Sequence, residues 1–573
     1  MAKQLPKVPV VIVGMGWTGG IIAAELTKAG VKVVGLERGK GRTTEDYFMG
    51  HDELRYVQRH EMMTDLSKET VTFRNNEKMR ALPMRAHGSF VMGDGVGGSG
   101  AHWNGQNYRF LPYDFEIRSN TVERYGEKKI PEGMAIQDWG ITYDELEPYY
   151  DKYEKMAGIS GDAEPNPMVG KRSNPFPTPA MKKTPSIKLF EEAAKSLGYH
   201  PYSIPSGNLS EQYKNPDGIE RAACQYCAYC ERFGCEYGSK ADPVVTVLPV
   251  AQRTGNLELR THSNVVKLLN DGKKATGVVY VNTLTGEEFE QPADIVILAS
   301  YVFSNVRLLL TSKLGKPYDA AAGTGVVGRN YAYQVQSARA TGFYDDKQFN
   351  LYMGAGALGS IFDDFNGDNF DHSNLNFLHG GGIRLTQTGL RPIASNSVPK
   401  GTPSWGKEFK QKSIKYANST LVVSTQGANL SWKHHYLDLD PTYKDAYGVP
   451  LIRLTFDFED QDRELAKFLG EKAGEVMKAM KPTTMEISNT VKSYDIVPYQ
   501  STHNTGGAVM GADPSTSAVN TYSQMWDAEN VFVVGASSFP HNSGYNPTGT
   551  IGALAYRAAE GILKYMQHGG SLV

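Results

Sequence analysis

What this chain lacks narrows its class before any motif is considered. It has no apolar run close to the roughly 20 residues that a membrane-spanning helix needs, and residues 1–6 lack the apolar core of a secretory signal peptide. Its formal net charge is −2 and it has no long basic segment, which argues against nucleic acid as a partner. We therefore expect a chain that spans no membrane and carries no export signal of its own.

Cysteine is also scarce. The 573 residues include four cysteines, and all four lie within twelve residues of one another, so they do not form a disulfide framework spread over the chain. A chain of this length is too long to fold around one simple hydrophobic core. We therefore expect two or three intertwined domains. With 40% hydrophobic and 21% charged residues, its composition is that of an ordinary globular protein.

The first forty residues predict a dinucleotide-binding unit. An apolar strand at 8–13, a helix at 20–28 and a second strand at 31–36 surround a glycine-rich turn. In such a unit the glycines permit the turn, the approach of a pyrophosphate and close helix packing. An acidic residue after the second strand accepts hydrogen bonds from a ribose. The residues in these four roles are Gly14, Gly16, Gly19 and Glu37.

A second glycine-rich segment spans residues 93–105, with five glycines in its first eight residues. A backbone of this composition can close around a ligand. Its aromatic and polar residues argue against a flexible linker, which is usually rich in glycine and serine alone. The cofactor contacts predicted here are Gly97, Gly98, Ser99, His102, Trp103 and Asn104.

Two segments near the C-terminus carry the candidate chemistry. Residues 501–511 hold His503 beside glycines, and residues 535–548 hold Asn546 just before a helix predicted at 549–566. A helix N-terminus offers unpaired N–H groups and partial positive charge, which suits a ligand that becomes anionic, such as a reduced flavin. The cofactor contacts predicted in this stretch are Gly535, Ala536, Pro547 and Thr548.

The four cysteines form a C-x2-C-x2-C-x4-C array. Four thiolates in one short loop can wrap a single metal centre, and this spacing is typical of iron–sulfur ligation. Structural zinc usually takes two pairs set further apart. We favour an iron–sulfur cluster, 3Fe–4S or 4Fe–4S, over structural zinc, with unligated thiols or disulfides as a third interpretation. The ligands would be Cys224, Cys227, Cys230 and Cys235.

The order of the predicted elements indicates an α/β fold with an added antiparallel part, α+β overall. Short alternating runs between 257 and 298 predict an antiparallel insert followed by a return to the parallel sheet. We expect a Rossmann-like nucleotide domain over 1–333 that includes the cysteine loop, and an antiparallel substrate domain over 334–492. Residues 493–573 would then return to the first domain.

Three further expectations concern structure. Residues 459–480 predict an amphipathic helix. The helix predicted at 143–156 is rich in charges, which we interpret as a solvated face. His434 and His435 fall in a strand-like pattern, where neighbours face opposite ways, and both are interpreted as structural.

Together these motifs resemble the glucose–methanol–choline (GMC) family of flavin oxidoreductases over nearly the whole chain. The resemblance is carried by the N-terminal fingerprint with Glu37, residues 97–99, His503 and residues 546–548. Within the family, the cysteine array and two segments resemble the flavoprotein subunits of bacterial sugar dehydrogenases of the gluconate 2-dehydrogenase type. The two segments are Asp138–Tyr150 and Tyr436–Pro441.

The resemblance implies FAD as the cofactor, with His102 matching the histidine that bonds covalently to the flavin in some relatives. It makes His503 the catalytic base and Asn546 its partner across the substrate hydroxyl. Many relatives have a second histidine in place of Asn546, and those acting on pyranoses often have asparagine. One departure is Ala299-Ser300-Tyr301, where relatives commonly carry a glycine-containing segment.

The implied activity is dehydrogenation of a secondary hydroxyl of a sugar or sugar acid. Hydride would pass to FAD, and electrons would leave through the iron–sulfur cluster to a cytochrome or quinone-linked acceptor. Such flavoproteins usually pair with a small subunit that carries a twin-arginine signal, and often with a multihaem cytochrome c. The implied location is the periplasm or the outer face of the cytoplasmic membrane, with the cytoplasm as the alternative.

Three other functions stay open at the level of sequence. One is a glycoside 3-dehydrogenase on the same scaffold, the second an oxygen-using pyranose oxidase with structural zinc, and the third a non-catalytic flavoprotein that acts as a binding or sensor module. A pocket cation would separate gluconate from a neutral glycoside, because only gluconate has a carboxylate. The sequence by itself does not identify that cation.

Overall fold

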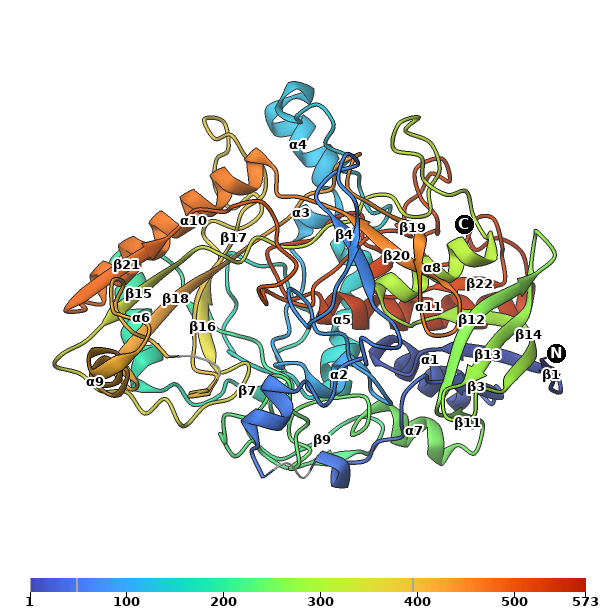
Figure 1. The fold of residues 1–573 in the computed structure, drawn as a ribbon, viewed down its shortest axis with the longest axis horizontal. Helices are drawn as coiled ribbons and strands as arrows, with labels where there is room; N and C mark the ends of the chain where they lie inside the picture. Colours follow the sequence, from blue (N-terminus) through green and yellow to red (C-terminus); the bar gives the residue numbers. More distant parts are fainter. Residues whose placement is uncertain (1, 48–49, 394–395) are drawn as a thin grey trace.

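The structure is a computed structural model that describes residues 2–47, 50–393 and 396–573 (Figure 1). Its largest sheet has eight strands and occupies the right-hand half of Figure 1. The main path of this sheet is β11 (Leu257–Arg260), β3 (Val33–Leu36), β2 (Val8–Val13), β14 (Glu288–Leu298), β13 (Ala275–Asn282) and β12 (Ser263–Asn270), and the strands off this path are β1 (Lys3–Gln4) and β22 (Val531–Val533).

The parallel part of this sheet is the nucleotide-binding unit predicted from the sequence. β14 runs parallel to β2 and to β22, and β2 runs parallel to β3. The predicted insert is confirmed, since β12 and β13 pair antiparallel and β13 pairs antiparallel with β14. Both faces of β2 are buried: Val10 and Ile12 pack in one core cluster, Val11 and Val13 in another, as expected for a central parallel strand.

One face of this sheet is covered by helices. α1 (Trp17–Lys28) packs against α7 (Val247–Arg253) and α11 (Thr548–His568), and α11 packs against α5 (Tyr143–Ala157). α1 begins at Trp17, three residues earlier than predicted, directly after the glycine turn. The C-terminal helix therefore lies against the first helix of the chain, and the two ends of the sequence build one unit.

A second sheet of six antiparallel strands lies on the left of Figure 1. Five of its strands come from residues 334–492. Its order is β21 (Thr484–Ser488), β15 (Arg339–Phe343), β18 (Thr420–Gly427), β17 (Gly381–Thr386), β16 (Gly359–Phe362) and β8 (Tyr202–Ser203). The predicted amphipathic helix is confirmed as α10 (Asp460–Ala479), which packs on β15 and β18 and contacts α6 (Pro185–Ser196).

A third sheet of four strands joins the early chain to residues 436–455. It consists of β19 (Tyr436–Lys444), β20 (Pro450–Thr455), β4 (Val71–Arg74) and β5 (Leu82–Pro83). The strand predicted around His434 and His435 is wrong, because His434 lies in a turn and His435 links that turn to β19. Their Nε2 atoms lie 2.7 and 3.2 Å from the same Glu459 oxygen, so the turn directs both rings to one side.

The predicted solvated face of α5 is also partly wrong. Glu154 is 2% exposed and its carboxylate accepts two hydrogen bonds of 2.9 Å from the guanidinium of Arg109. Arg172 contacts the same carboxylate, and Glu147 accepts a 2.7 Å bond from Arg109. Charged residues on this helix therefore also form a buried ion-pair cluster, which the helical charge pattern alone does not separate from a solvated face.

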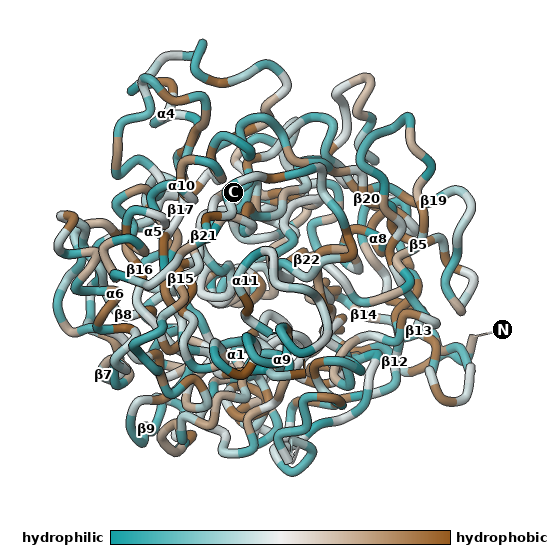
Figure 2. The backbone as a smooth tube through the Cα atoms, turned by 60° about the vertical axis from the view of Figure 1, so that its left-hand side comes forward, coloured by the Kyte–Doolittle hydropathy of each residue, from teal (hydrophilic) through white to brown (hydrophobic). Residues whose placement is uncertain are grey.

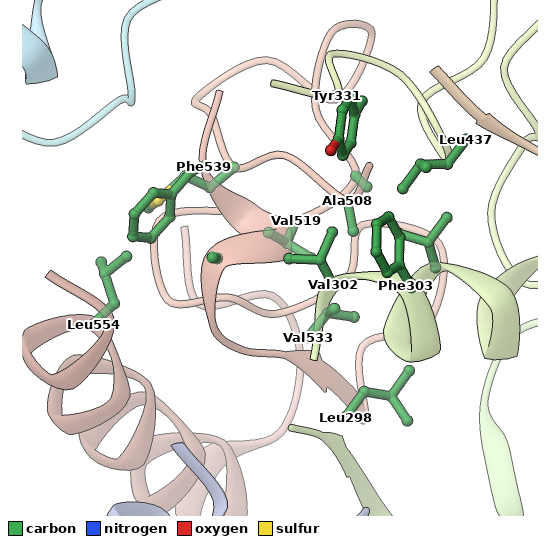
Figure 3. Close-up of a cluster of buried hydrophobic side chains, with 14 of the residues drawn as sticks. Leu298, Val302, Phe303, Tyr331, Leu437, Ala508, Val519, Val533, Phe539 and Leu554 are labelled. Carbon is green, nitrogen blue, oxygen red and sulfur yellow. The ribbon is translucent and has the colours of Figure 1, made fainter. Parts of the chain in front are cut away.

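A hydrophobic cluster lies where the strands of the large sheet end (Figure 3). It packs the ends of β14 and β22 against the start of α8 (Val302–Ser312) and against the chain around residues 508 and 539. The labelled members are Leu298, Val302, Phe303, Tyr331, Leu437, Ala508, Val519, Val533, Phe539 and Leu554. This packing fixes the backbone that leads into both C-terminal segments singled out by the sequence.

Many of the outer loops are rich in hydrophilic residues (Figure 2). No helix among the described residues combines the length and the apolar composition needed to cross a bilayer.

Candidate active site

A cavity of about 260 Å³ lies at the carboxyl ends of β2, β14 and β22. In open α/β sheets this edge is where ligands bind. The cavity brings together four segments that are far apart in the sequence. The predicted site residues on its wall are Gly14, Gly16, Glu37, Gly98, Ser99, His102, Trp103, Asn104, His503, Gly535, Ala536, Asn546, Pro547 and Thr548.

The two remaining predicted glycines, Gly19 and Gly97, do not line the cavity but hold together the segments that do. A Cβ atom on Gly19 would lie 2.0 Å from the carbonyl oxygen of Gly14, so any other residue would push α1 away from the turn. The N–H of Gly97 donates a 2.9 Å hydrogen bond to the carbonyl of Met15, with φ of +91° at Gly97. The two glycine-rich segments are thereby joined backbone to backbone.

Glu37 is buried at the end of β3, with its carboxylate on the cavity wall. Its oxygens accept hydrogen bonds from the backbone N–H groups of Met15, at 3.1 Å, and Gly39, at 3.0 Å. A carboxylate has about four acceptor positions. These two bonds fix the side chain and leave capacity for ribose hydroxyls, the role predicted for it.

The N-terminus of α11 opens onto the same cavity. Pro547 occupies the N-cap position, immediately before the first helical residue Thr548. No side chain caps this end of the helix. Pro547, Thr548 and Ile551 line the cavity. Uncapped first-turn N–H groups and the positive end of a 21-residue helix dipole therefore face the space where an anionic ligand would be held.

His503 has its tautomer set by a residue that the sequence did not reveal. Its Nδ1 lies 2.6 Å from Oε1 of the buried Gln334. The amide nitrogen of Gln334 donates to the carbonyls of Ser543 and Tyr545, at 2.8 and 2.6 Å, so its oxygen is the atom that faces the ring. Nδ1 then carries the proton, and Nε2 is left as an acceptor.

Electrostatics keeps His503 neutral. Burial lowers the pKa of His503 to about 3, and the positive charge of Arg384 acts in the same direction. A neutral imidazole with a bare nitrogen is the form that a general base requires.

Asn546 is 4% exposed and lies on the same wall as His503. Its Oδ1 accepts a 3.3 Å hydrogen bond from Nη1 of Arg384, and the same Nη1 donates a 2.6 Å bond to Oε1 of Gln106. Because the oxygen of Asn546 is engaged, its NH2 group is available as a donor. The pair thus presents one acceptor and one donor, which suits a hydroxyl that loses its proton.

His102 ends the short helix α2 (Ser99–His102) and is 4% exposed. Its Nε2 is buried and has no hydrogen-bond partner within the described part of the chain. Burial lowers the pKa of His102 to about 3, with the charges of Lys240 and Arg42 acting in the same direction. A buried ring nitrogen without a partner on a ligand cavity fits attachment or close contact of a flavin. The neighbouring Trp103 is held separately, by a 2.6 Å bond from its Nε1 to the carbonyl of Ala241.

The four cysteines line one small cavity together with Asn208 and Ser239. All four are free thiols. Burial raises the pKa of Cys230 to about 11, so a metal would have to displace its proton. No three of these sulfurs, all within the described residues, lie inside 4.8 Å of one another.

The cysteine loop touches the large cavity directly. The N–H of Arg232 donates a 2.7 Å bond to the carbonyl of His102, and Glu231 lines the cavity wall. Lys240, a residue that the sequence did not single out, is fully buried between the two regions. Its ammonium donates to the carbonyls of Trp103, Cys230 and Phe233, at 2.7, 2.9 and 2.8 Å. One lysine therefore ties the predicted flavin segment to the predicted cluster loop.

A sheet with the nucleotide-binding glycine turn, an antiparallel second sheet, and a neutral histidine with an asparagine on the cavity at the carboxyl edge of the first sheet are the arrangement expected of a flavin-dependent oxidoreductase. A family model described as GMC oxidoreductase matches residues 436–555. The chain is 44% identical to the gluconate 2-dehydrogenase flavoprotein of Pantoea cypripedii, in an alignment that covers 100% of this chain and 96% of that protein. The fructose dehydrogenase large subunit of Gluconobacter japonicus is 24% identical, with 99% and 100% covered.

Among solved structures, pyridoxine 4-oxidase from Mesorbium loti has a TM-score of 0.60 at 17% identity, covering 98% of this chain and 99% of that one. The chain belongs to the GMC oxidoreductase family, and it is an FAD-dependent oxidoreductase that acts on CH–OH groups. The resemblance and the fold class predicted from the sequence are confirmed.

Proposed function

We propose that this chain is the catalytic flavoprotein of a dehydrogenase that oxidises a secondary hydroxyl of a sugar or sugar acid, of the gluconate 2-dehydrogenase type. The observation that carries the proposal is the pair His503 and Asn546 on the wall of the nucleotide-side cavity. The relative at 44% identity, whose name states gluconate 2-dehydrogenase, supports the substrate class.

In this mechanism Nε2 of His503 accepts the proton of the substrate hydroxyl. Gln334 holds the ring so that Nδ1 keeps its own proton and Nε2 faces the substrate. The NH2 group of Asn546 donates a hydrogen bond to the developing alkoxide. FAD, when bound, supplies the hydride acceptor, and the uncapped N–H groups of α11 stabilise the negative charge that results.

The residues proposed to hold FAD fit it by shape and by polarity. The glycine turns bring the backbone to the cavity, Glu37 has free acceptor capacity for a ribose, and His102 offers an unpartnered nitrogen for a covalent bond. The proposed set is Gly14, Gly16, Gly19, Glu37, Gly97, Gly98, Ser99, His102, Trp103, Asn104, Gly535, Ala536, Pro547 and Thr548.

The four cysteines are proposed to ligate an iron–sulfur cluster, 3Fe–4S or 4Fe–4S. Tetrahedral zinc with Zn–S bonds of about 2.3 Å would draw all four sulfurs to within about 4 Å of one another. No three of the sulfurs, all of them in the described ranges, lie within 4.8 Å of one another, so the loop would have to contract to hold a single zinc. The C-x2-C-x2-C spacing is the reason for preferring the cluster. Contact between this loop and His102 gives electrons a short exit from the flavin.

Electrons that leave through the proposed cluster need an acceptor, so we propose that the chain works with partner subunits. One relative is named as a large subunit, which supports assembly with further chains. We propose a small subunit with a twin-arginine signal, a multihaem cytochrome c as an acceptor, and a periplasmic location reached with that small subunit. The division into 1–333, 334–492 and 493–573 is proposed as the domain organisation.

The test is an anaerobic absorbance spectrum of the purified protein before and after gluconate, glucose and a methyl glucoside are added in turn. We expect gluconate to bleach the flavin bands. Bleaching by the methyl glucoside alone would favour a glycoside 3-dehydrogenase. Peroxide formation in air by a protein without iron would favour a pyranose oxidase with zinc. Absence of bleaching by any of the three would favour the sensor module.

A further inference from the structure

A guanidinium stands beside the proposed catalytic pair, on the side of the six-stranded sheet. Arg384 lies in the middle of β17, in the six-stranded sheet. Its neighbours Ile383 and Leu385 are buried in the apolar core beneath that sheet. Because side chains alternate along a strand, Arg384 emerges on the opposite face, where it meets Asn546.

The charge of Arg384 is not neutralised by the groups that hold it. Its Nη1 donates to Oε1 of Gln106 at 2.6 Å and to Oδ1 of Asn546 at 3.3 Å, and both acceptors are neutral amides. The side chain is half-buried, a setting in which a charge normally has an ionic partner. A guanidinium has five donors in a planar fork, which matches the two oxygens of a carboxylate.

The two arginines that line the nucleotide-side cavity, Arg38 and Arg307, have ionic partners. Arg38 lies 3.3 Å from a carboxylate oxygen of Glu69, and Arg307 lies 2.6 Å from one of Asp445. Within the described part of the chain, Arg384 hydrogen-bonds Asn546, acts on His503 by its charge, and has no ion pair.

The geometry points to Arg384 as the binding site for a substrate carboxylate, which assigns the substrate to the 2-hydroxy acids, here sugar acids. This inference rests on the proposed roles of His503 and Asn546. In a 2-hydroxy acid the carboxylate is bonded to the carbon that is oxidised. Its receptor must then lie within a few ångströms of the group that binds the hydroxyl, as Nη1 of Arg384 does at 3.3 Å from Asn546. A neutral glycoside would leave this guanidinium unpaired.

The experiment compares two substrates that differ only in charge. Gluconate and its neutral amide, gluconamide, share the same hydroxyls, and the rate of anaerobic flavin reduction is measured with each. We expect the wild-type protein to prefer gluconate in kcat/KM by roughly 30-fold or more, the factor that corresponds to loss of one partner from a buried charge pair. The Arg384→Gln variant should lose this preference, and Arg384→Lys should keep part of it.

Arg339→Gln is the matched control, because Arg339 is an exposed arginine on β15 of the same sheet. This variant should keep the wild-type ratio. A second readout is binding of 2-deoxygluconate, which lacks the reacting hydroxyl, measured by the change it causes in the oxidised flavin spectrum. Its Kd should rise in Arg384→Gln by about the same factor as the loss of preference.

The outcomes separate this inference from the proposed function. Equal rates with gluconate and gluconamide in the wild-type protein would overturn the carboxylate site and leave the dehydrogenase standing. An unchanged ratio in Arg384→Gln would overturn it too, since a merely structural arginine does not set a charge preference. Flavin reduction by neither substrate would overturn the proposed function, and the carboxylate site with it.

Discussion

At the scale of single residues, the proposed site depends on how four side chains orient one another. Gln334 fixes the tautomer of His503, and Arg384 occupies the oxygen of Asn546. Neither supporting residue would touch the reacting carbon, yet each decides which atom of its neighbour faces the substrate. The proposed chemistry therefore depends on hydrogen bonds behind His503 and Asn546 as well as on these two residues.

His503→Ala removes the proposed base. We expect flavin reduction by gluconate to slow by roughly 10²–10⁴-fold, the usual contribution of a general base, while the flavin content stays unchanged. Stopped-flow absorbance under anaerobic conditions measures the rate. His568→Ala, an exposed histidine at the end of α11, is the control. A near-normal rate in His503→Ala would remove this residue from the mechanism.

The pH dependence of the base follows from its surroundings. Burial lowers the pKa of His503 and the charge of Arg384 lowers it further, so the base stays neutral well below its ordinary pKa of about 6.5. Removing the positive charge in Arg384→Gln raises that pKa, which protonates the base at a higher pH. With gluconamide as substrate, we expect the acid limb of kcat/KM to move upward in this variant. An acid limb at the wild-type position would contradict the electrostatic coupling.

At the scale of elements, the cysteine loop is hydrogen-bonded to the segment around His102 that is proposed to bind the flavin. Three backbone carbonyls from the two segments converge on the ammonium of Lys240. Positive φ angles at Tyr226, Ala228 and Arg232 show that the loop turns sharply to wrap its cysteines. The loop is thereby held against His102, as the proposed electron path requires.

Lys240→Met replaces the ammonium by an apolar group of similar length. Three buried carbonyls would lose their donor, each at a cost of about 1–3 kcal/mol if no water replaces it. We expect flavin reduction by substrate to be nearly unchanged, while reoxidation by the acceptor slows and the thermal midpoint falls. Lys274→Met, an exposed lysine paired with Glu529, is the control. Normal reoxidation in Lys240→Met would show that the link has no role in electron exit.

Cys227→Ser tests the proposed iron–sulfur cluster. We expect flavin reduction by substrate to persist, iron content to fall and transfer to the physiological acceptor to slow. Metal analysis and the two half-reaction rates measure these effects. Unchanged acceptor turnover would rule out the cysteine centre as the relay.

At the scale of the whole molecule, a buried polar cluster joins the three proposed parts of the chain. Asp114 is fully buried, and its Oδ1 lies 2.7 Å from Nε2 of His379 and 3.4 Å from Nε2 of His541. Ser543 donates to its other oxygen at 3.0 Å. Burial alone would raise the pKa of Asp114, but the two histidines outweigh it and hold that pKa below its ordinary value.

Asp114→Ala should destabilise the whole protein, because it leaves His379, His541 and Ser543 without their buried hydrogen-bond acceptor. We expect a loss in the free energy of unfolding of about 1–3 kcal/mol for each buried group left unsatisfied. The urea midpoint measures it, with Asp371→Ala on the surface as the control. A midpoint equal to that of the control would show that this cluster does not hold the parts together.

The sequence by itself determined what lies within contiguous motifs. Strand, glycine turn, helix and acid follow one another in the first forty residues, and local patterning specifies such a unit without distant contacts. The cysteine array and the segments around His503 and Asn546 are equally local, so their residues could be named from the sequence.

The tertiary structure alone decided which distant residues support that chemistry. Gln334 lies 169 positions from His503, and Arg384 lies 162 from Asn546, each in a strand-like stretch with no motif around it. Sequence periodicity records which face of a strand is buried, but it does not record what lies across from the other face. The same limit explains the misread charges of α5, because burial of Glu154 depends on Arg109 arriving from another segment.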